Sequence, residues 1–130
     1  MARYLNIALA VVAWIFVATI VIQVFLIGLA LFDDPAFQET HRDFGYTGVG
    51  IAAIALLIVA LVARPGRRLL GAVVVLFVLY IVQTSLPEFR DSYPAIAALH
   101  PVVALGIFVL ALQIARMATA LAREPDAPAA

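Results

Sequence analysis

Residues 4–32 read YLNIALAVVAWIFVATIVIQVFLIGLALF, a run without a charged side chain. Crossing the roughly 30 Å hydrocarbon core of a bilayer takes about 20 helical residues, so this stretch is long enough to span it once. Three further uncharged windows, each close to that length or longer, are bounded by Asp43 and Arg64, by Arg68 and Glu88, and by Asp91 and Arg116. The sequence therefore predicts four transmembrane helices, over residues 4–32, 41–63, 68–87 and 94–116, in one domain of residues 1–123.

The composition supports a membrane protein and excludes several classes of function. Of the 130 residues, 66% are hydrophobic and 12% are charged, whereas a soluble domain has about 45–50% apolar and about 25% charged residues. The absence of cysteine excludes disulfide scaffolds, Fe–S clusters and thiol catalysis. The formal net charge of zero argues against a nucleic-acid partner, because phosphate binding needs a basic surface.

The expected architecture is all-α. Helices are favoured over barrel strands because the four windows lack polar alternation, and a helix satisfies its own backbone groups in lipid. Pro65 and Gly66 make a tight turn between the second and third spans. Connections this short make sequential helices antiparallel neighbours, so we expect an up-down-up-down four-helix bundle. Residues 124–130, with two prolines among alanines, are expected to form a disordered cytoplasmic tail.

The arginines predict an orientation. With a cytoplasmic amino terminus, six arginines lie inside and two, Arg42 and Arg90, lie outside. This asymmetry follows the positive-inside rule and places both termini in the cytoplasm. The abundance of alanine and the use of arginine without lysine suit a GC-rich bacterial genome, so we expect a multi-pass protein of the bacterial cytoplasmic (inner) membrane.

The chain also contains an internal repeat. The pattern P-A-x4-H-x22-R occurs at residues 35–64 and again at residues 94–123, and superimposing the two copies aligns His41 with His100. These are the chain's two histidines. Gln23 and Gln83 occupy nearly equivalent positions in the preceding helices, one residue out of phase. The arrangement predicts a parallel repeat that places both histidines at one depth, just below the outer interface.

Two intramembrane histidines at matching depth suggest a cofactor. A histidine in a membrane span is costly without a partner, and two imidazoles at one depth suit the two axial positions of a heme iron. The expected cofactor is heme b, with His41 and His100 as the iron ligands. Gly45 and Gly48 follow His41 on its helix face, and Ala104 follows His100, so these small residues are candidates for clearing space for the porphyrin.

The two outer arginines, Arg42 and Arg90, are the candidate partners of the heme propionates, which prefer to leave the bilayer core towards a cation. Glu39 and Asp43 flank His41, but residues two apart point about 200° away from each other on a helix, so a carboxylate–histidine metal site would need ligands from elsewhere.

Other readings of these residues stay open. The histidines could be a structural pair or could bind copper or zinc, and the glycines could serve close helix packing. Gln23 and Gln83 are expected to make hydrogen bonds between helices in preference to binding a quinone.

The segments E-T-H-R, from Glu39 to Arg42, and A-L-H-P, from Ala98 to Pro101, resemble the heme A synthase family. Each half of those enzymes is a parallel-repeat four-helix bundle with histidine ligands near the outer side of its second and fourth helices. This chain corresponds to a single half, and Glu39 lies two residues before His41, where that family has three. The resemblance therefore implies heme b binding without synthase activity. The whole chain is also similar to small four-helix membrane proteins of actinobacteria.

We therefore expect a small membrane b-type cytochrome that binds one bis-histidine heme near the outer face and serves electron transfer or acts as a redox accessory subunit. With both axial positions filled by protein, no enzymatic chemistry at the iron is expected. One alternative is a cofactor-free accessory subunit of a larger membrane complex. Another is half of a heme-modifying enzyme that acts as a dimer. The expected partners are the lipid bilayer and either a membrane protein or further copies of the chain, with no nucleic acid.

Overall fold

The computed structural model describes residues 2–124, and the described chain is helical throughout except for its connections. The elements are α1 (Ala2–Phe32), α2 (Phe37–Phe44), the π-helical turn η1 (Gly45–Val49), α3 (Gly50–Ala63), α4 (Arg67–Ser85), the 3-10 helix η2 (Leu86–Phe89), α5 (Pro94–Ala97) and α6 (His100–Arg123). The predicted all-α class is confirmed. Of the expected tail at 124–130, all but Glu124 lies outside the described residues.

Four helical stretches are long and apolar enough to cross a membrane, as the sequence predicted. They cover Arg3–Phe32, Phe37–Ala63, Arg67–Phe89 and Pro94–Arg123. Their outward-facing side chains are largely apolar, including Phe25, Ile51, Val78 and Leu105. Such an outer surface suits the hydrocarbon of a bilayer, where helices carry apolar side chains on all sides.

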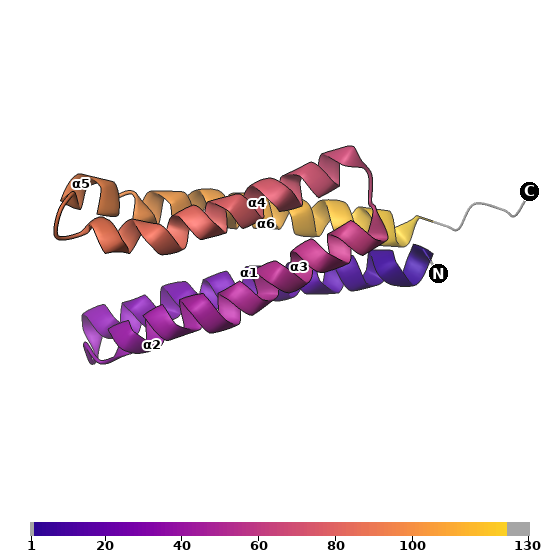
Figure 1. The fold of residues 1–130 in the computed structure, drawn as a ribbon. Helices are drawn as coiled ribbons and strands as arrows, with labels where there is room; N and C mark the ends of the chain where they lie inside the picture. The colour runs from indigo at the N-terminus through magenta and orange to yellow at the C-terminus, as the bar shows by residue number, and fades with distance from the viewer. Residues whose placement is uncertain (1, 125–130) are drawn as a thin grey trace, which may run out of the picture.

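The four long helices occupy the corners of a bundle. Helix α1 packs against α3 and α6, and α4 packs against the same two helices. Therefore α3 and α6 lie diagonally opposite each other. The start of α1 and the end of α6 lie at one end of the bundle, whereas α2 and α5 lie at the other (Figure 1). This second end is called the histidine end below, because it carries His41 on α2 and His100 at the start of α6.

Prolines lie near the beginning of both helical stretches that carry a histidine, but they occupy different positions in the two stretches. Pro35 lies in the turn before α2, which begins at Phe37. Pro94 does begin α5, but this helix ends at Ala97, and α6 begins at His100 with Pro101 in its first turn. A proline inside a continuous helix would clash with the carbonyl four residues earlier, here that of Ala97, so the interruption has a steric cause.

A continuous hydrophobic core fills the half of the bundle away from the histidine end. Its largest fully buried side chains include Phe16 of α1, Leu56 of α3, Leu76 of α4 and Ile114 of α6. Alanines fill much of the remaining interface and allow the helices to approach closely, as small residues do between membrane helices. The core ends at Ile20 on α1, Val49 on η1, Tyr80 on α4 and Ile107 on α6.

Candidate functional site

The two histidines lie side by side at the histidine end of the bundle. The centroids of the His41 and His100 imidazole rings are 6.3 Å apart, and the ring planes make an angle of 70°. His41 comes from α2, which continues through η1 into α3, and His100 comes from α6. The two imidazoles therefore approach each other from diagonally opposite corners of the bundle.

Each histidine is held by the backbone of the preceding helix in the chain. Nδ1 of His41 lies 2.9 Å from the carbonyl oxygen of Gln23, and Nδ1 of His100 lies 3.0 Å from that of Gln83. A carbonyl only accepts hydrogen bonds, so Nδ1 is the protonated nitrogen in both rings. In the neutral imidazole this leaves the lone pair on Nε2, the arrangement that backbone carbonyls impose on metal-ligating histidines.

The glutamine side chains form a second set of contacts. The amide nitrogen Nε2 of Gln23 donates a hydrogen bond of 2.8 Å to the backbone carbonyl of His41. The predicted hydrogen bond between helices is therefore confirmed for Gln23. The Oε1 atoms of Gln23 and Gln83 are buried, and neither has a hydrogen-bond partner within the described residues. The first hairpin (α1 to α3) and the second hairpin (α4 to α6) thus share one contact, between the backbone carbonyl of a glutamine and a histidine ring.

The small residues beside the histidines accommodate neighbouring side chains. A Cβ on Gly45 would come within 2.7 Å of Nε2 of Gln23, and a Cβ on Gly48 would overlap the Phe44 ring. The space beside these two glycines is therefore occupied by protein side chains. Ala104 lies on α6 one turn after His100 and is partly buried.

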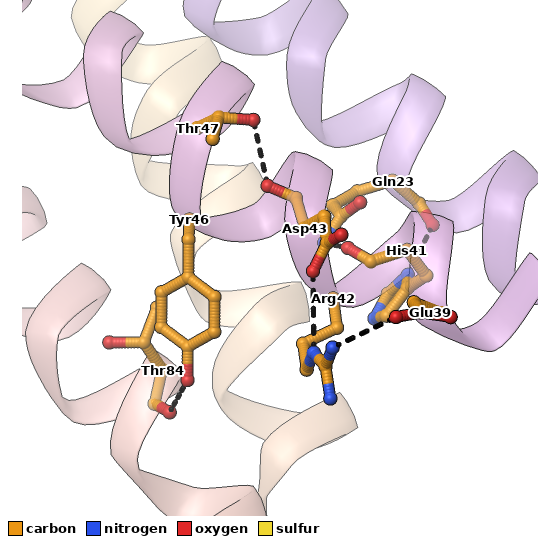
Figure 2. Close-up of polar contacts among 8 residues, drawn as sticks. All are labelled: Gln23, Glu39, His41, Arg42, Asp43, Tyr46, Thr47 and Thr84. Atoms are coloured by element: carbon orange, nitrogen blue, oxygen red, sulfur yellow. Dashed lines mark hydrogen bonds and ion pairs between the residues drawn. The ribbon is translucent and has the colours of Figure 1, made fainter.

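The candidate propionate partners lie at the histidine end. Arg42 follows His41 on α2, and Arg90 follows η2; both side chains are exposed. The Arg42 guanidinium lies 3.4 Å from a carboxylate oxygen of Glu39 and 3.4 Å from one of Asp43 (Figure 2). Arg90 lies 3.7 Å from Asp91. Glu39 and Asp43 therefore pair with Arg42, and the imidazole of His41 bonds to the backbone of Gln23.

Ligands for a bare metal ion are few at this site. No group of three or more histidine, cysteine, aspartate or glutamate side chains converges within residues 2–124. The two histidines are a pair without a third protein ligand in that range. Structural zinc sites have four ligands, and catalytic zinc sites have three protein ligands.

The layer around the histidines is half-buried. It lies beyond the point where the core ends, and neither α2 nor α5 has a buried residue. His41 and His100 are partly exposed, as are Phe44 on α2 and Val103 on α6. Apart from the buried Leu86 on η2, the side chains at this end are thus more exposed than those of the packed half.

Sequence reasoning missed a contact that joins the two hairpins near the site. The hydroxyl of Tyr80 on α4 donates a hydrogen bond of 3.2 Å to the backbone carbonyl of Gly45, the first residue of the π-helical turn. Such turns are frequent at functional sites. A polar hydroxyl in the middle of an apolar span, together with three glycines at 45, 48 and 50, was the signal available in the sequence.

A comparison with protein families matches residues 23–88 to the model described as "Family of unknown function (DUF6220)". The matched stretch is half of the chain and contains Gln23, His41, Tyr80 and Gln83, whereas His100 lies beyond its end. No curated protein and no solved structure matches the chain. The resemblance to heme A synthases therefore stays a prediction.

Proposed function

The chain belongs to the Family of unknown function (DUF6220), and we propose that it is a small membrane b-type cytochrome in which His41 and His100 hold one heme. A bound heme would supply a one-electron redox centre, and His41 and His100 would be the residues that hold its iron. With two histidine ligands such a centre would transfer electrons, and oxygen or substrate chemistry at the iron would not be expected. The proposed role is electron transfer or that of a redox subunit in a larger membrane assembly.

The separation of the two imidazoles carries the proposal. Two metal–nitrogen bonds of about 2 Å on opposite sides of one ion put the ring centres about 6 Å apart. The observed separation of the ring centroids is 6.3 Å. In both rings Nδ1 is engaged by a backbone carbonyl, so Nε2 is the nitrogen available to a metal.

The small number of protein ligands favours heme over a bare ion. A heme brings four nitrogens of its own, so it needs only two axial ligands, and the described chain offers two histidines without a third ligand. The half-buried layer also supports a planar cofactor, because the packed core ends before it reaches the histidines. Helical bundles commonly hold cofactors between side chains of facing helices.

The proposal includes a place in the membrane. The four helices would form an up-down-up-down bundle in the bacterial inner membrane, with both termini in the cytoplasm, as the distribution of arginines indicates. The histidine end would face outward. Arg42 and Arg90 lie at this end. Arg42 is adjacent to His41 in the sequence, and Arg90 lies in the connection between η2 and α5, which supports their role as propionate partners.

The position of the proposed heme near one face of the membrane implies a redox partner. A single redox centre near one face does not by itself cross about 30 Å of hydrocarbon. An electron donor or acceptor must therefore approach from the outer side, or a neighbouring membrane protein must supply a second centre. The apolar outer surface of the bundle suits the bilayer and such a neighbour alike.

The absorption spectrum of the purified protein tests the proposal. The protein is expressed with excess heme, purified in mild detergent and recorded before and after reduction with dithionite. We expect a sharp Soret band and resolved α and β bands on reduction, unchanged by carbon monoxide. A colourless protein would support the cofactor-free accessory subunit instead. A heme that binds carbon monoxide would favour the heme-modifying alternative, and bound copper or zinc without heme would contradict both.

A further inference from the structure

Tyr80 is the polar side chain at the boundary between the packed core and the histidine end. It is buried, with 8% of its surface exposed, and it belongs to the hydrophobic core cluster. Its hydroxyl crosses from α4 to the other hairpin, where it donates to the carbonyl of Gly45 over 3.2 Å. A buried hydroxyl needs such a partner, because leaving it unpaired costs free energy.

The two ends of this hydrogen bond lie close in sequence to His41 and to Gln83, whose carbonyl holds His100. Gly45 follows His41 by four residues, which is about one helical turn. Tyr80 precedes Gln83 by three residues on α4, and the carbonyl of Gln83 binds Nδ1 of His100. A single contact thus connects the helix of His41 to the helix whose backbone orients His100.

Glycines permit this contact on both sides. A Cβ on Gly50 would lie 2.6 Å from the Tyr80 hydroxyl oxygen, so a larger residue there would displace the hydroxyl. The Gln23 side chain packs on Gly45 as well, within 2.7 Å of the position of a Cβ. The first residue of the π-helical turn is therefore held between a side chain of α1 and a side chain of α4.

We infer that Tyr80 is a positioning residue that fixes the spacing and the relative orientation of the His41 and His100 rings. Its consequence for a bound heme rests on the proposed function, whereas its effect on the two helices does not. The angle of 70° between the rings is the property that Tyr80 maintains. Without its hydroxyl, the helix of His41 loses the shorter of its two polar contacts with α4, and the two rings sample a range of angles.

Tyr46 makes a weaker contact between the same helices. Its hydroxyl lies 3.5 Å from the carbonyl of Thr84, and the side chain is exposed. Tyr93 makes no hydrogen bond through its hydroxyl within the described residues, and it is exposed too. Tyr93→Phe is therefore the matched control for Tyr80→Phe, because both remove one hydroxyl and keep the ring.

The first test uses protein without heme. The chain has no cysteine, so Gln38→Cys on α2 and Val102→Cys on α6 introduce two spin labels at exposed positions. Pulsed EPR then measures the distribution of distances between the two labels. We expect Tyr80→Phe to broaden the distribution, Gly50→Ala to broaden it in the same way, and Tyr93→Phe to leave it unchanged. An unchanged distribution in Tyr80→Phe would overturn the inference.

The second test uses the heme-loaded protein and reads ligand orientation. Nearly perpendicular imidazoles give low-spin ferric heme a strongly anisotropic EPR signal with a large maximum g value, whereas parallel imidazoles give a rhombic signal. We expect the large value in the wild type and a shift towards the rhombic signal, with broader lines, in Tyr80→Phe. The same signal in both proteins would contradict the inference and leave the proposed cytochrome standing. If no chain binds heme, the proposed function fails, and the spin-label distances alone decide the role of Tyr80.

Discussion

The rings of His41 and His100 meet across the diagonal of the bundle, with their centroids 6.3 Å apart and their planes at 70°. Within residues 2–124, neither ring makes a hydrogen bond or ion pair with a charged side chain. Each is bound at Nδ1 by a backbone carbonyl of the helix that precedes it, from Gln23 in one hairpin and Gln83 in the other. Backbone carbonyls fix the tautomer without adding a negative charge beside the site, so neither of these two hydrogen bonds requires an acidic side chain.

Replacement of either histidine tests the pair. We expect His41→Ala and His100→Ala each to abolish the six-coordinate low-spin spectrum, because each removes one of two axial ligands. Leu105→Ala on the exposed face of α6 is the control and should keep the wild-type spectrum. Added imidazole should restore the low-spin bands in either histidine variant. A low-spin spectrum that survives one of the substitutions unchanged would show that the histidine in question is not a ligand.

Removal of the Gln23 side chain tests whether its hydrogen bond stabilises the fold without being required for heme binding. Gln23→Ala loses the hydrogen bond to the carbonyl of His41, and such bonds between membrane helices contribute about 0.6–2 kcal/mol. The backbone carbonyl that orients His41 remains, so we expect a lower Tm in detergent with the heme spectrum retained. Gln83→Ala is the matched variant. It removes a buried oxygen without a partner in the described chain, so we expect a smaller fall in Tm than for Gln23→Ala. An equal fall in Tm would contradict the assignment of the stability difference to the hydrogen bond of Gln23.

Glycine substitutions test the packing beside His41. Gly48→Ala would force the Phe44 ring to move, and overpacking of this kind typically costs about 1–3 kcal/mol. We therefore expect a clear loss of thermal stability. Gly71→Ala is the control, because nothing lies within 4 Å of its added Cβ. Its stability should be unchanged or slightly higher, since alanine favours the helix over glycine. Equal stability of Gly48→Ala and wild type would contradict the observed contact.

Reporter fusions test the orientation in the membrane. Six arginines lie on the side of the chain ends and two on the side of the histidine end. A reporter that is active only in the cytoplasm should give a signal at either terminus, and one that is active only outside should give a signal when inserted after Asp91. An outside signal from either terminus would reverse the predicted topology and place the histidines near the cytoplasm.

The sequence was informative where charge alone determines structure. The spans predicted at residues 4–32 and 68–87 could be assigned to helices because an uncharged stretch of about that length has few other stable forms in lipid. The helix of His41 begins at Phe37, whereas the expected span began at residue 41. Its first turns carry Glu39, Arg42 and Asp43, which interrupt the uncharged window, so the window did not show where the helix begins. The positions of charged residues delimit the apolar part of a helix, but they do not show whether a polar turn extends the helix further.

The candidate site was predicted only in part. The internal repeat singled out His41 and His100, and the structure brings their rings together. The roles of the two glutamines' carbonyls could not be read from side-chain identity, because any residue supplies a backbone carbonyl. The contact between Tyr80 and Gly45 depends on the π-helical turn, which shifts the register of the helix. No periodic pattern of residues in the sequence predicts such a turn.

The proposed cytochrome requires that both histidines ligate one iron. Pulsed EPR on ferric protein labelled with ¹⁵N-histidine measures it directly, because the hyperfine couplings identify the histidine nitrogens bound to the metal. We predict two strongly coupled histidine nitrogens for each low-spin heme, and one heme per chain. A single coupled nitrogen, or protein that retains no heme iron, would contradict the claim.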